Sequence, residues 1–244
     1  MLPTNIAYRT FFFRAAQYGT AFTLDVGDSE YLITAAHLLP ESGDKIPIQI
    51  FFNNAWIQGS AVVVGRGRGE VDIAVLRLET RLTPAGFPVT PSLGHLYVGQ
   101  DVFFVGFPYK MSVDYGELFA GRPGPFLKKG ALSAITFRSP KTLYVDALNN
   151  EGFSGGPLYF FRNNLVHEPP CIAGVVSKYR VEPEPVVAAD GSSTGMNVHY
   201  NTGFLVAYDV QLALDLIIRS GGAHLISIER TSSGKPEGAT HVKQ

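Results

Sequence analysis

The amino-acid sequence predicts an all-β protein that folds as a sandwich or barrel. Short apolar runs rich in β-branched and aromatic residues recur along the chain, and clusters of Gly, Pro, Asn and Asp separate them. Helical periodicity is almost absent between these runs, which argues against a fold that alternates strands with helices. The expected strands are Thr20–Val26, Glu30–Ala35, Ile46–Phe52, Trp56–Val64, Val71–Leu78, Val102–Phe107, Ala131–Phe137, Thr142–Asp146, Leu158–Phe161, Cys171–Ser177 and Gly203–Ala207.

One segment near the end of the chain departs from this pattern and predicts a helix. Asp209 is placed to cap a helix over Val210–Arg219, which Gly221 and Gly222 would end. Leu212, Leu216 and Ile217 would then lie on one face of the helix. Such an apolar stripe is typical of core packing, so we give this helix no catalytic role.

The segments between strands predict the organisation of the chain. Leu82–Pro91 contains three prolines and one glycine, and we expect it to link two β units. Arg180–Asn201 is interpreted as a long polar loop. Glu229–Gln244 has almost no large apolar residue, which predicts a disordered tail. The aromatic residues Tyr8 and Phe11–Phe13 could pack on the first β unit or on a neighbouring subunit, and we favour the first β unit.

Composition excludes several classes of partner. The formal net charge is −1, so no strong field attracts nucleic acid or an anionic membrane. The densest basic group, Arg66-Gly67-Arg68, is interpreted as a solvated loop. No stretch approaches the ~18 apolar residues of a membrane-spanning helix.

The single cysteine, Cys171, cannot form an internal disulfide or a Cys/His zinc site, and we expect it to be a buried apolar residue. A fold without disulfides suits a reducing compartment. Residues 1–20 lack the apolar core of a signal peptide. We therefore predict a cytoplasmic protein that needs no metal or organic cofactor.

Three segments could supply the parts needed for peptide hydrolysis, which are a nucleophile, a base and donors for an oxyanion. His37 ends the apolar segment Thr34–His37, and Asp72 lies inside an apolar run where a buried acid needs a partner. Ser154 lies in the turn Gly152–Pro157, where glycines allow backbone N–H groups to converge. A base and an orienting acid activate a serine in this way.

Each of these residues also has an ordinary structural interpretation. A histidine at the end of a strand is usually a satisfied structural residue, Asp72 could be a strand-edge charge, and Gly155-Gly156 could be a plain turn. The remaining histidines lack a comparable context, and they are His95, His167, His199, His224 and His241. The three segments together favour catalysis.

Two rival hypotheses stay open at this point. The segment from Gly152 to Gly156 also fits the G-x-S-x-G nucleophile elbow of α/β-hydrolases, which would make the protein an esterase. That class needs its acid and histidine after the serine and helices between the strands. The second rival is a peptidase fold that only binds peptides.

The three segments resemble the signature blocks of trypsin-like, chymotrypsin-fold serine peptidases, in the same order. Further segments are similar to the bacterial Htr/Deg-like branch. These are Gly19–Phe22, Val98–Val102, Gly106–Pro108, Asp146-Ala147 and Gly203–Val206. The resemblance covers about residues 17–218. Htr/Deg relatives usually carry a PDZ domain downstream, and we expect none here, because the residues that follow the predicted helix are too few for one.

The resemblance implies two packed antiparallel β-barrels of the chymotrypsin type with a C-terminal helix. Residues 1–81 would form the first barrel, 82–96 a linker, 97–228 the second barrel with the helix, and 229–244 a disordered tail. His37 would be the general base, Asp72 its orienting acid and Ser154 the nucleophile. The N–H groups of Gly152 and Ser154 would form the oxyanion hole.

The resemblance also implies how a peptide or protein substrate binds. Ser177, Lys178 and Tyr179 would pair with an extended substrate backbone. Leu148, Asn149 and Glu151, together with Gly203 and Phe204, would line the primary specificity pocket. Because Leu148 is apolar, a small or medium apolar side chain is favoured over Lys or Arg.

Phe153 stands where digestive relatives carry an acid that pairs with a freed N-terminus. Activation by N-terminal cleavage is therefore not expected. With a phenylalanine at this position, the sequence does not decide between two states of the oxyanion loop, which is the turn that contains Gly152 and Ser154. The loop is either ordered before substrate binds or ordered only by the substrate.

Overall fold

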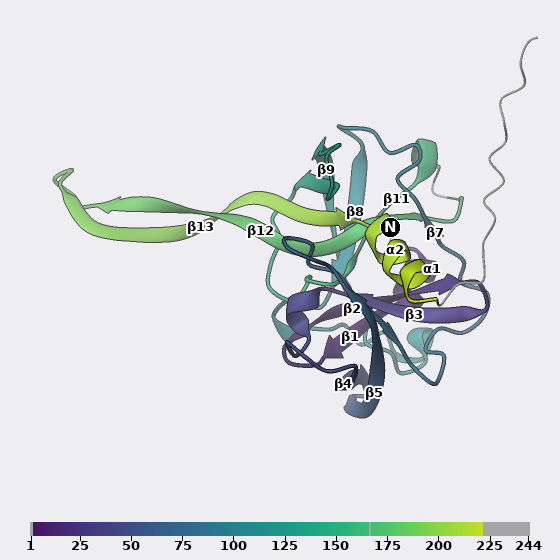
Figure 1. Cartoon of the computed structure of the whole chain (residues 1–244). Coiled ribbons are helices and arrows are strands. Elements are labelled where there is room, and N and C mark those ends of the chain that lie inside the picture. Colours follow the sequence, from purple (N-terminus) through teal and green to yellow (C-terminus); the bar gives the residue numbers. More distant parts are fainter. Residues whose placement is uncertain (1, 166, 222–244) are drawn as a thin grey trace, which may run out of the picture.

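The computed structural model describes residues 2–165 and 167–221, and it is mostly β (Figure 1). The predicted tail 229–244 and the histidines at 224 and 241 lie outside the described residues. Two closed sheets pack against each other, which confirms the all-β, chymotrypsin-type fold. No described helix is long and apolar enough to cross a membrane.

The first sheet is a closed barrel in the strand order β1-β2-β3-β6-β5-β4. Antiparallel pairing of Phe13 with Ile50 joins β1 to β4 and closes the barrel. The strands are β1 (Thr10–Arg14), β2 (Tyr18–Val26), β3 (Ser29–Thr34), β4 (Lys45–Phe52), β5 (Ala55–Arg66) and β6 (Ala74–Arg77). Phe11–Phe13 lies in β1 and is therefore part of this barrel, in agreement with the prediction that it packs on the first β unit.

The second sheet has the order β11-β8-β9-β10-β13-β12-β7, and pairing of β11 with β12 makes it ring-like. Its short edge strand β7 (Thr90–Pro91) lies within the segment that the sequence predicted as a linker. The other strands are β8 (Asp101–Gly106), β9 (Phe126–Ile135), β10 (Thr142–Asp146), β11 (Pro157–Phe160), β12 (Cys171–Val187) and β13 (Ser193–Asp209).

Helices are few and short. The predicted C-terminal helix is present as α2 (Gln211–Arg219), and Asp209 Oδ1 accepts a hydrogen bond from the Gln211 N–H at 2.9 Å, as a capping residue does. α1 (Thr4–Arg9) precedes the first barrel. The 3₁₀ turns in the described residues are η1 (Ala36–Leu38), η2 (Pro108–Lys110), η3 (Gly116–Phe119) and η4 (Arg162–Asn164).

The prediction of a long polar loop over Arg180–Asn201 is wrong. β12 and β13 continue through this segment as an antiparallel ribbon, with Val181 opposite Asn201 and Val187 opposite Ser193. The ribbon is exposed on both faces, and the run Glu182-Pro183-Glu184-Pro185 in β12 lacks the alternation of apolar and polar residues that a half-buried strand shows. Its polar and proline residues resemble those of a loop for this reason.

Other boundaries differ for related reasons. β1 was not predicted as a strand, because its run of three phenylalanines is buried on both sides and does not alternate. β9 begins five residues before the predicted start, within a polar stretch around Lys128 and Lys129. The loop interpretation of Arg66-Gly67-Arg68 holds only in part, since Arg66 ends β5 and is half-buried while Arg68 is exposed.

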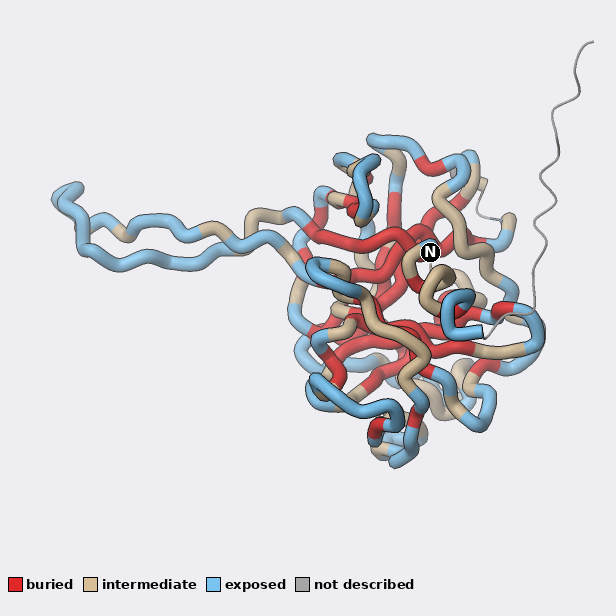
Figure 2. Tube along the Cα trace, viewed as in Figure 1, coloured by how far each residue is buried: buried red, intermediate tan, exposed pale blue. Residues whose placement is uncertain are grey.

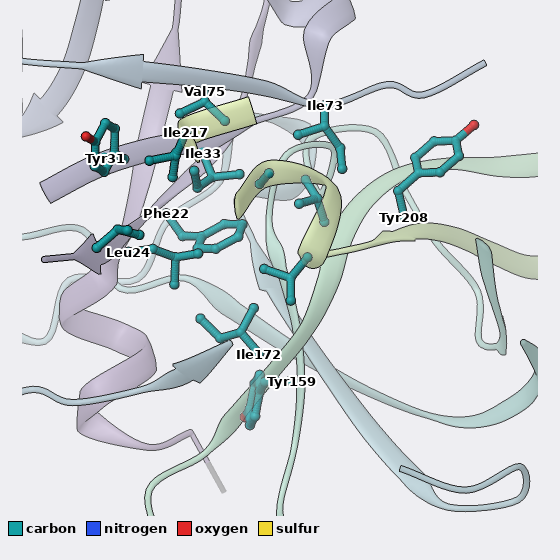
Figure 3. Packing of buried hydrophobic residues seen from close by; sticks show 14 of the residues in the cluster. Phe22, Leu24, Tyr31, Ile33, Ile73, Val75, Tyr159, Ile172, Tyr208 and Ile217 are labelled. Atoms are coloured by element: carbon teal, nitrogen blue, oxygen red, sulfur yellow. The ribbon is translucent and has the colours of Figure 1, made fainter. Parts of the chain in front are cut away.

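A buried cluster joins both sheets and α2 into one core. Phe22, Ile33 and Val75 come from the first barrel, Tyr159 and Ile172 from the second sheet, and Ile217 from α2 (Figure 3). Buried residues also line the interior of each sheet, while the β12–β13 ribbon is exposed (Figure 2). The cluster fixes the angle between the sheets, on which any site between them depends.

Truncation of Ile217 tests the contribution of α2 to this core. Ile217 is fully buried and Ile218 is 57% exposed, so the two residues form a matched pair. We expect Ile217→Ala to lower the free energy of unfolding by about 2–5 kcal/mol, because the truncation leaves a cavity, and Ile218→Ala to change it by less than about 0.5 kcal/mol. Urea unfolding followed by circular dichroism measures both, and equal losses would contradict the packing of α2.

Candidate active site

His37 and Asp72 meet because two neighbouring strands of the first barrel bring them together. His37 lies in η1 directly after β3, and Asp72 lies shortly before β6. β3 pairs with β6 through Thr34 and Ala74, so the segments that flank these strands lie side by side. A separation of 35 residues in the sequence is thereby reduced to hydrogen-bond distance.

The Asp72 carboxylate receives two hydrogen bonds from His37. His37 Nδ1 lies 2.6 Å from Asp72 Oδ2, and the His37 backbone N–H donates to Asp72 Oδ1 at 2.9 Å. An ionised carboxylate only accepts hydrogen bonds, so the imidazole proton resides on Nδ1. His37 Nε2 is then left as the basic nitrogen, which is the tautomer that a general base needs.

A third donor to Asp72 comes from the second sheet. Ser177 Oγ donates to Asp72 Oδ2 at 2.6 Å, although the two residues are 105 positions apart. Burial by itself raises the pKa of Asp72, but the hydrogen bonds from His37 and Ser177 outweigh burial and hold that pKa below its usual value. The carboxylate therefore stays charged near neutral pH and orients the imidazole.

Ser154 is held where the two sheets meet. The Gly155 N–H donates to the Val176 carbonyl at 2.7 Å, and the Thr20 N–H donates to the Ser154 carbonyl at 2.9 Å. Gly155 has φ +82°, and a Cβ there would lie 2.1 Å from the Thr20 carbonyl oxygen. Only glycine fits this position, so the close approach of β2 to the turn requires the glycine that follows Ser154.

The Ser154 hydroxyl points toward the second sheet. Ser154 Oγ donates to the Ser177 carbonyl at 2.8 Å, and no hydrogen bond joins it to His37 within the described part of the chain. Even so, one hollow of about 550 Å³ holds all of these groups. Its lining residues are His37, Asp72, Glu151, Ser154, Ser177, Lys178 and Tyr179.

The backbone N–H groups of Gly152 and Ser154 donate to no acceptor among the described residues. The Gly152 carbonyl is held by Thr20 Oγ1 at 2.6 Å, and the same hydroxyl accepts the Phe107 N–H at 3.2 Å. Thr20 thus sets the orientation of the peptide that follows Gly152. In the sequence, Thr20 stands out only as part of the segment Gly19–Phe22, and nothing local to that segment indicates this role.

Phe153 anchors the turn in the interior of the second sheet. It is fully buried, and its ring lies 5.0 Å from the Phe104 ring in an edge-on arrangement. Lys128 Nζ lies 5.5 Å from the centre of the Phe153 ring. Packing and a cation therefore hold the position that an acid occupies in digestive relatives.

Lys128 also binds the loop that leads into Ser154. Its Nζ donates to the Leu148 carbonyl at 2.6 Å and to the Asn150 side-chain oxygen. Burial lowers the pKa of Lys128. Sequence reasoning missed this residue because the polar stretch around it was not predicted as strand. Its position opposite Phe104 in the β8–β9 pair directs it toward Phe153.

The other residues predicted for the specificity pocket lie around this loop. Leu148 is exposed, whereas Asn149 is buried and its carbonyl accepts from the Asn201 side chain at 2.6 Å. The Gly203 carbonyl accepts the Ala147 N–H at 2.8 Å. Phe204 is exposed and lines a different hollow with Tyr144 and Tyr200. No cluster of three or more potential metal ligands occurs among the described residues.

The sequence matches the trypsin-like peptidase domain family over residues 19–166. This match spans more than half of the chain and includes the segments that carry His37, Asp72 and Ser154. The protein therefore belongs to that family. No curated protein matches the sequence significantly.

Solved structures of bacterial proteases share the fold. The Rv3671c protease from M. tuberculosis in its active form is 16% identical, with TM-score 0.56, over 91% of this chain and 85% of that chain. The serine endoprotease from Yersinia pestis is 20% identical, with TM-score 0.54, over 90% of this chain and 68% of that chain. The HtrA-type protease AlgW, solved with a tripeptide, is 19% identical, with TM-score 0.55, over 91% of this chain and 62% of that chain.

Removal of the Ser177 hydroxyl tests the electrostatics of Asp72. A carboxyl with a lowered pKa adds stability above its unfolded pKa of about 3.9, and this stability is lost as the pH falls through the folded value. Ser177→Ala removes one donor, so the pKa of Asp72 rises and acid unfolding begins at higher pH. Circular dichroism during acid titration measures the shift. Ser154→Ala is the control, because its hydroxyl does not bind Asp72, and equal curves for all proteins would contradict this account.

Proposed function

We propose that the protein is a serine endopeptidase that uses Ser154 as nucleophile, His37 as general base and Asp72 as the orienting acid. The observation that carries the proposal is the Asp72 carboxylate, which accepts from His37 Nδ1, the His37 N–H and Ser177 Oγ. This arrangement leaves His37 Nε2 basic and directs the ring toward the hollow that contains Ser154. Membership of the trypsin-like peptidase domain family supports the same reaction.

The proposed reaction begins with a change in the Ser154 side chain. Its hydroxyl donates to the Ser177 carbonyl in the free protein, so it must turn toward His37 Nε2 before proton transfer. An extended substrate paired with Ser177–Tyr179 would bring its own N–H to that carbonyl. Catalytic hydrogen bonds often form only in the substrate complex, so this resting geometry is compatible with activity.

Ser154 Oγ then attacks the peptide carbonyl, and His37 takes the hydroxyl proton. The N–H groups of Gly152 and Ser154 stabilise the oxyanion, which is usually the largest single contribution in such sites. His37 passes the proton to the leaving amine, and an acyl ester on Ser154 remains. A water molecule attacks this ester with His37 again as base, and the acid is released.

The substrate class follows from the site and its relatives. The HtrA-type protease AlgW was solved with a tripeptide, which supports a peptide ligand for the similar hollow here. Preference for a small or medium apolar side chain and a cytoplasmic location stay predictions. The esterase hypothesis is wrong, because α/β-hydrolases need a sheet with helices between its strands and the described chain forms two closed sheets.

Labelling with a fluorophosphonate probe tests the proposal. We expect the wild type to react at one site, Ser154→Ala not to react, and His37→Ala to react at least about 10³-fold more slowly, because the base is lost. Asp72→Asn should also react slowly, since the imidazole then adopts the wrong tautomer. Mass spectrometry identifies the labelled residue. A folded wild type that is never labelled would support the binding-only hypothesis and overturn the enzyme.

Replacement of Lys128 tests whether it positions the oxyanion loop. Lys128→Met keeps the length of the side chain but loses the bonds to Leu148 and Asn150, and we expect kcat to fall about 10–100-fold with little change in KM. The rate advantage of the wild type should fade as the pH rises through the lowered pKa of Lys128, and the variant should lack this dependence.

Lys129→Met is the matched control, because Lys129 pairs with Asp101 on the surface at 2.7 Å. Equal kinetics for the two variants would show that Lys128 has no positioning role. Thermal unfolding of each variant separates this effect from a loss of folded protein.

A further inference from the structure

The extended ends of β12 and β13 form a ribbon that stands away from the rest of the protein, as Figure 1 shows. We call residues 181–187 and 193–201 the β-arm. Its strands pair from Val181 opposite Asn201 to Val187 opposite Ser193. Nearly all of it is exposed (Figure 2). A two-stranded ribbon in water is marginally stable by itself, so a ribbon of this length is expected to be stabilised by a binding partner.

The outer edge of β12 is blocked against further strand pairing. Between the register shifts of this pair, Pro183 lies opposite His199 and Pro185 opposite Asn197. Proline cannot donate a ladder hydrogen bond, so the odd-numbered backbone groups here face away from β13 and the even-numbered groups face it. The odd-numbered groups face outward, and they include prolines at positions 183 and 185, which have no N–H to donate. Charged residues at positions 182 and 184 accompany them. Proline and charge are the usual means by which proteins protect an edge strand.

The outer edge of β13 carries none of these protections. The outward-facing residues of β12 lie opposite Asn201, His199 and Asn197, so the backbone groups of these three residues face outward on the other side. From Ser193 to Asn201, β13 has no proline and no Asp, Glu, Lys or Arg. One edge of the β-arm is therefore closed, and the other is open.

The open strand also presents an apolar stripe. Met196, Val198 and Tyr200 alternate along β13 and are 61%, 51% and 45% exposed. Alternate residues of a strand share one face, so these three side chains lie in a row beside the open edge. The stripe is symmetric about Val198, with one large apolar residue two positions away on each side.

We propose that β13 pairs antiparallel with β13 of a second copy of this chain, with the twofold axis at Val198. Asn197 would then lie opposite His199 of the second copy, and Met196 opposite Tyr200. The uncharged, symmetric strand matches itself, as a twofold interface requires. The prolines on the outer strands end the sheet at four strands, which gives a closed dimer and not a fibre. The proposal does not depend on the catalytic activity.

The oligomeric state of the full chain tests the dimer. We expect a dimer in sedimentation equilibrium, and Val198→Lys should weaken it at least about tenfold, because two like charges then lie directly opposite each other. Glu184→Lys is the matched control, since residue 184 lies opposite Val198 but on the outer strand, and it should leave the dimer intact. Asn197→Pro with His199→Pro should also give a monomer, because it removes the outward N–H groups.

A cysteine at the proposed axis gives a second test. Residues at a non-hydrogen-bonded antiparallel pair have Cα atoms about 4.5 Å apart, within the range of a disulfide. Val198→Cys should therefore form a covalent dimer under mild oxidation. Val187→Cys should not, although Val187 on the other strand is more exposed, at 63% against 51% for Val198. The native Cys171 is buried and should not contribute.

Two results would overturn the proposal. The first is that the wild type stays monomeric at every concentration up to about 100 µM and Val198→Cys forms no covalent dimer. This result is also expected if the β-arm binds only a different protein. The other is a dimer that Val198→Lys and the double proline variant leave unchanged. Circular dichroism of each variant shows whether the body of the protein is folded, and the substituted positions are all exposed.

Discussion

The geometry of the candidate site depends on the hydrogen bonds that the Asp72 carboxylate accepts. This carboxylate accepts hydrogen bonds from the ring and backbone of His37 in the first barrel and from Ser177 in the second sheet. One charged group therefore orients the imidazole and also joins the two sheets at the site. Burial of a carboxylate costs free energy unless donors surround it, and here three donors from both sides do so.

The turn around Ser154 is held by a different kind of force. Phe153 is buried against Phe104, and Lys128 lies over its ring while it binds the preceding loop. Thr20 holds the Gly152 carbonyl from the first barrel. These contacts exist without a freed N-terminus, and the N–H groups of Gly152 and Ser154 stay available to a ligand. Of the two states of this loop that the sequence left open, we therefore propose the one that is ordered before substrate binds.

The β-arm grows from the same strand that contains Ser177. β12 begins in the buried core, contributes the Ser177 contact to Asp72, and ends in the exposed ribbon. A partner bound to the arm would therefore touch an element that is continuous with the site. The two packed sheets are stabilised by burial of their side chains. The β-arm is exposed on both faces, and one of its edges is open.

The sequence by itself determined the β class, most strand positions and the final helix. It also identified the segments that contain His37, Asp72 and Ser154. These features could be predicted because apolar alternation, turn residues and glycines are read from short stretches of sequence. It could not show three hydrogen bonds that shape the site. Ser177 donates to Asp72, Lys128 donates to the Leu148 carbonyl, and Thr20 donates to the Gly152 carbonyl. Those contacts depend on strand register and on how two sheets pack, which join residues far apart in the chain. The exposed ribbon was missed because no face of it is buried and because the run Glu182-Pro183-Glu184-Pro185 in β12 has the composition of a loop. Only the tertiary structure decided which polar residues lie inside the site.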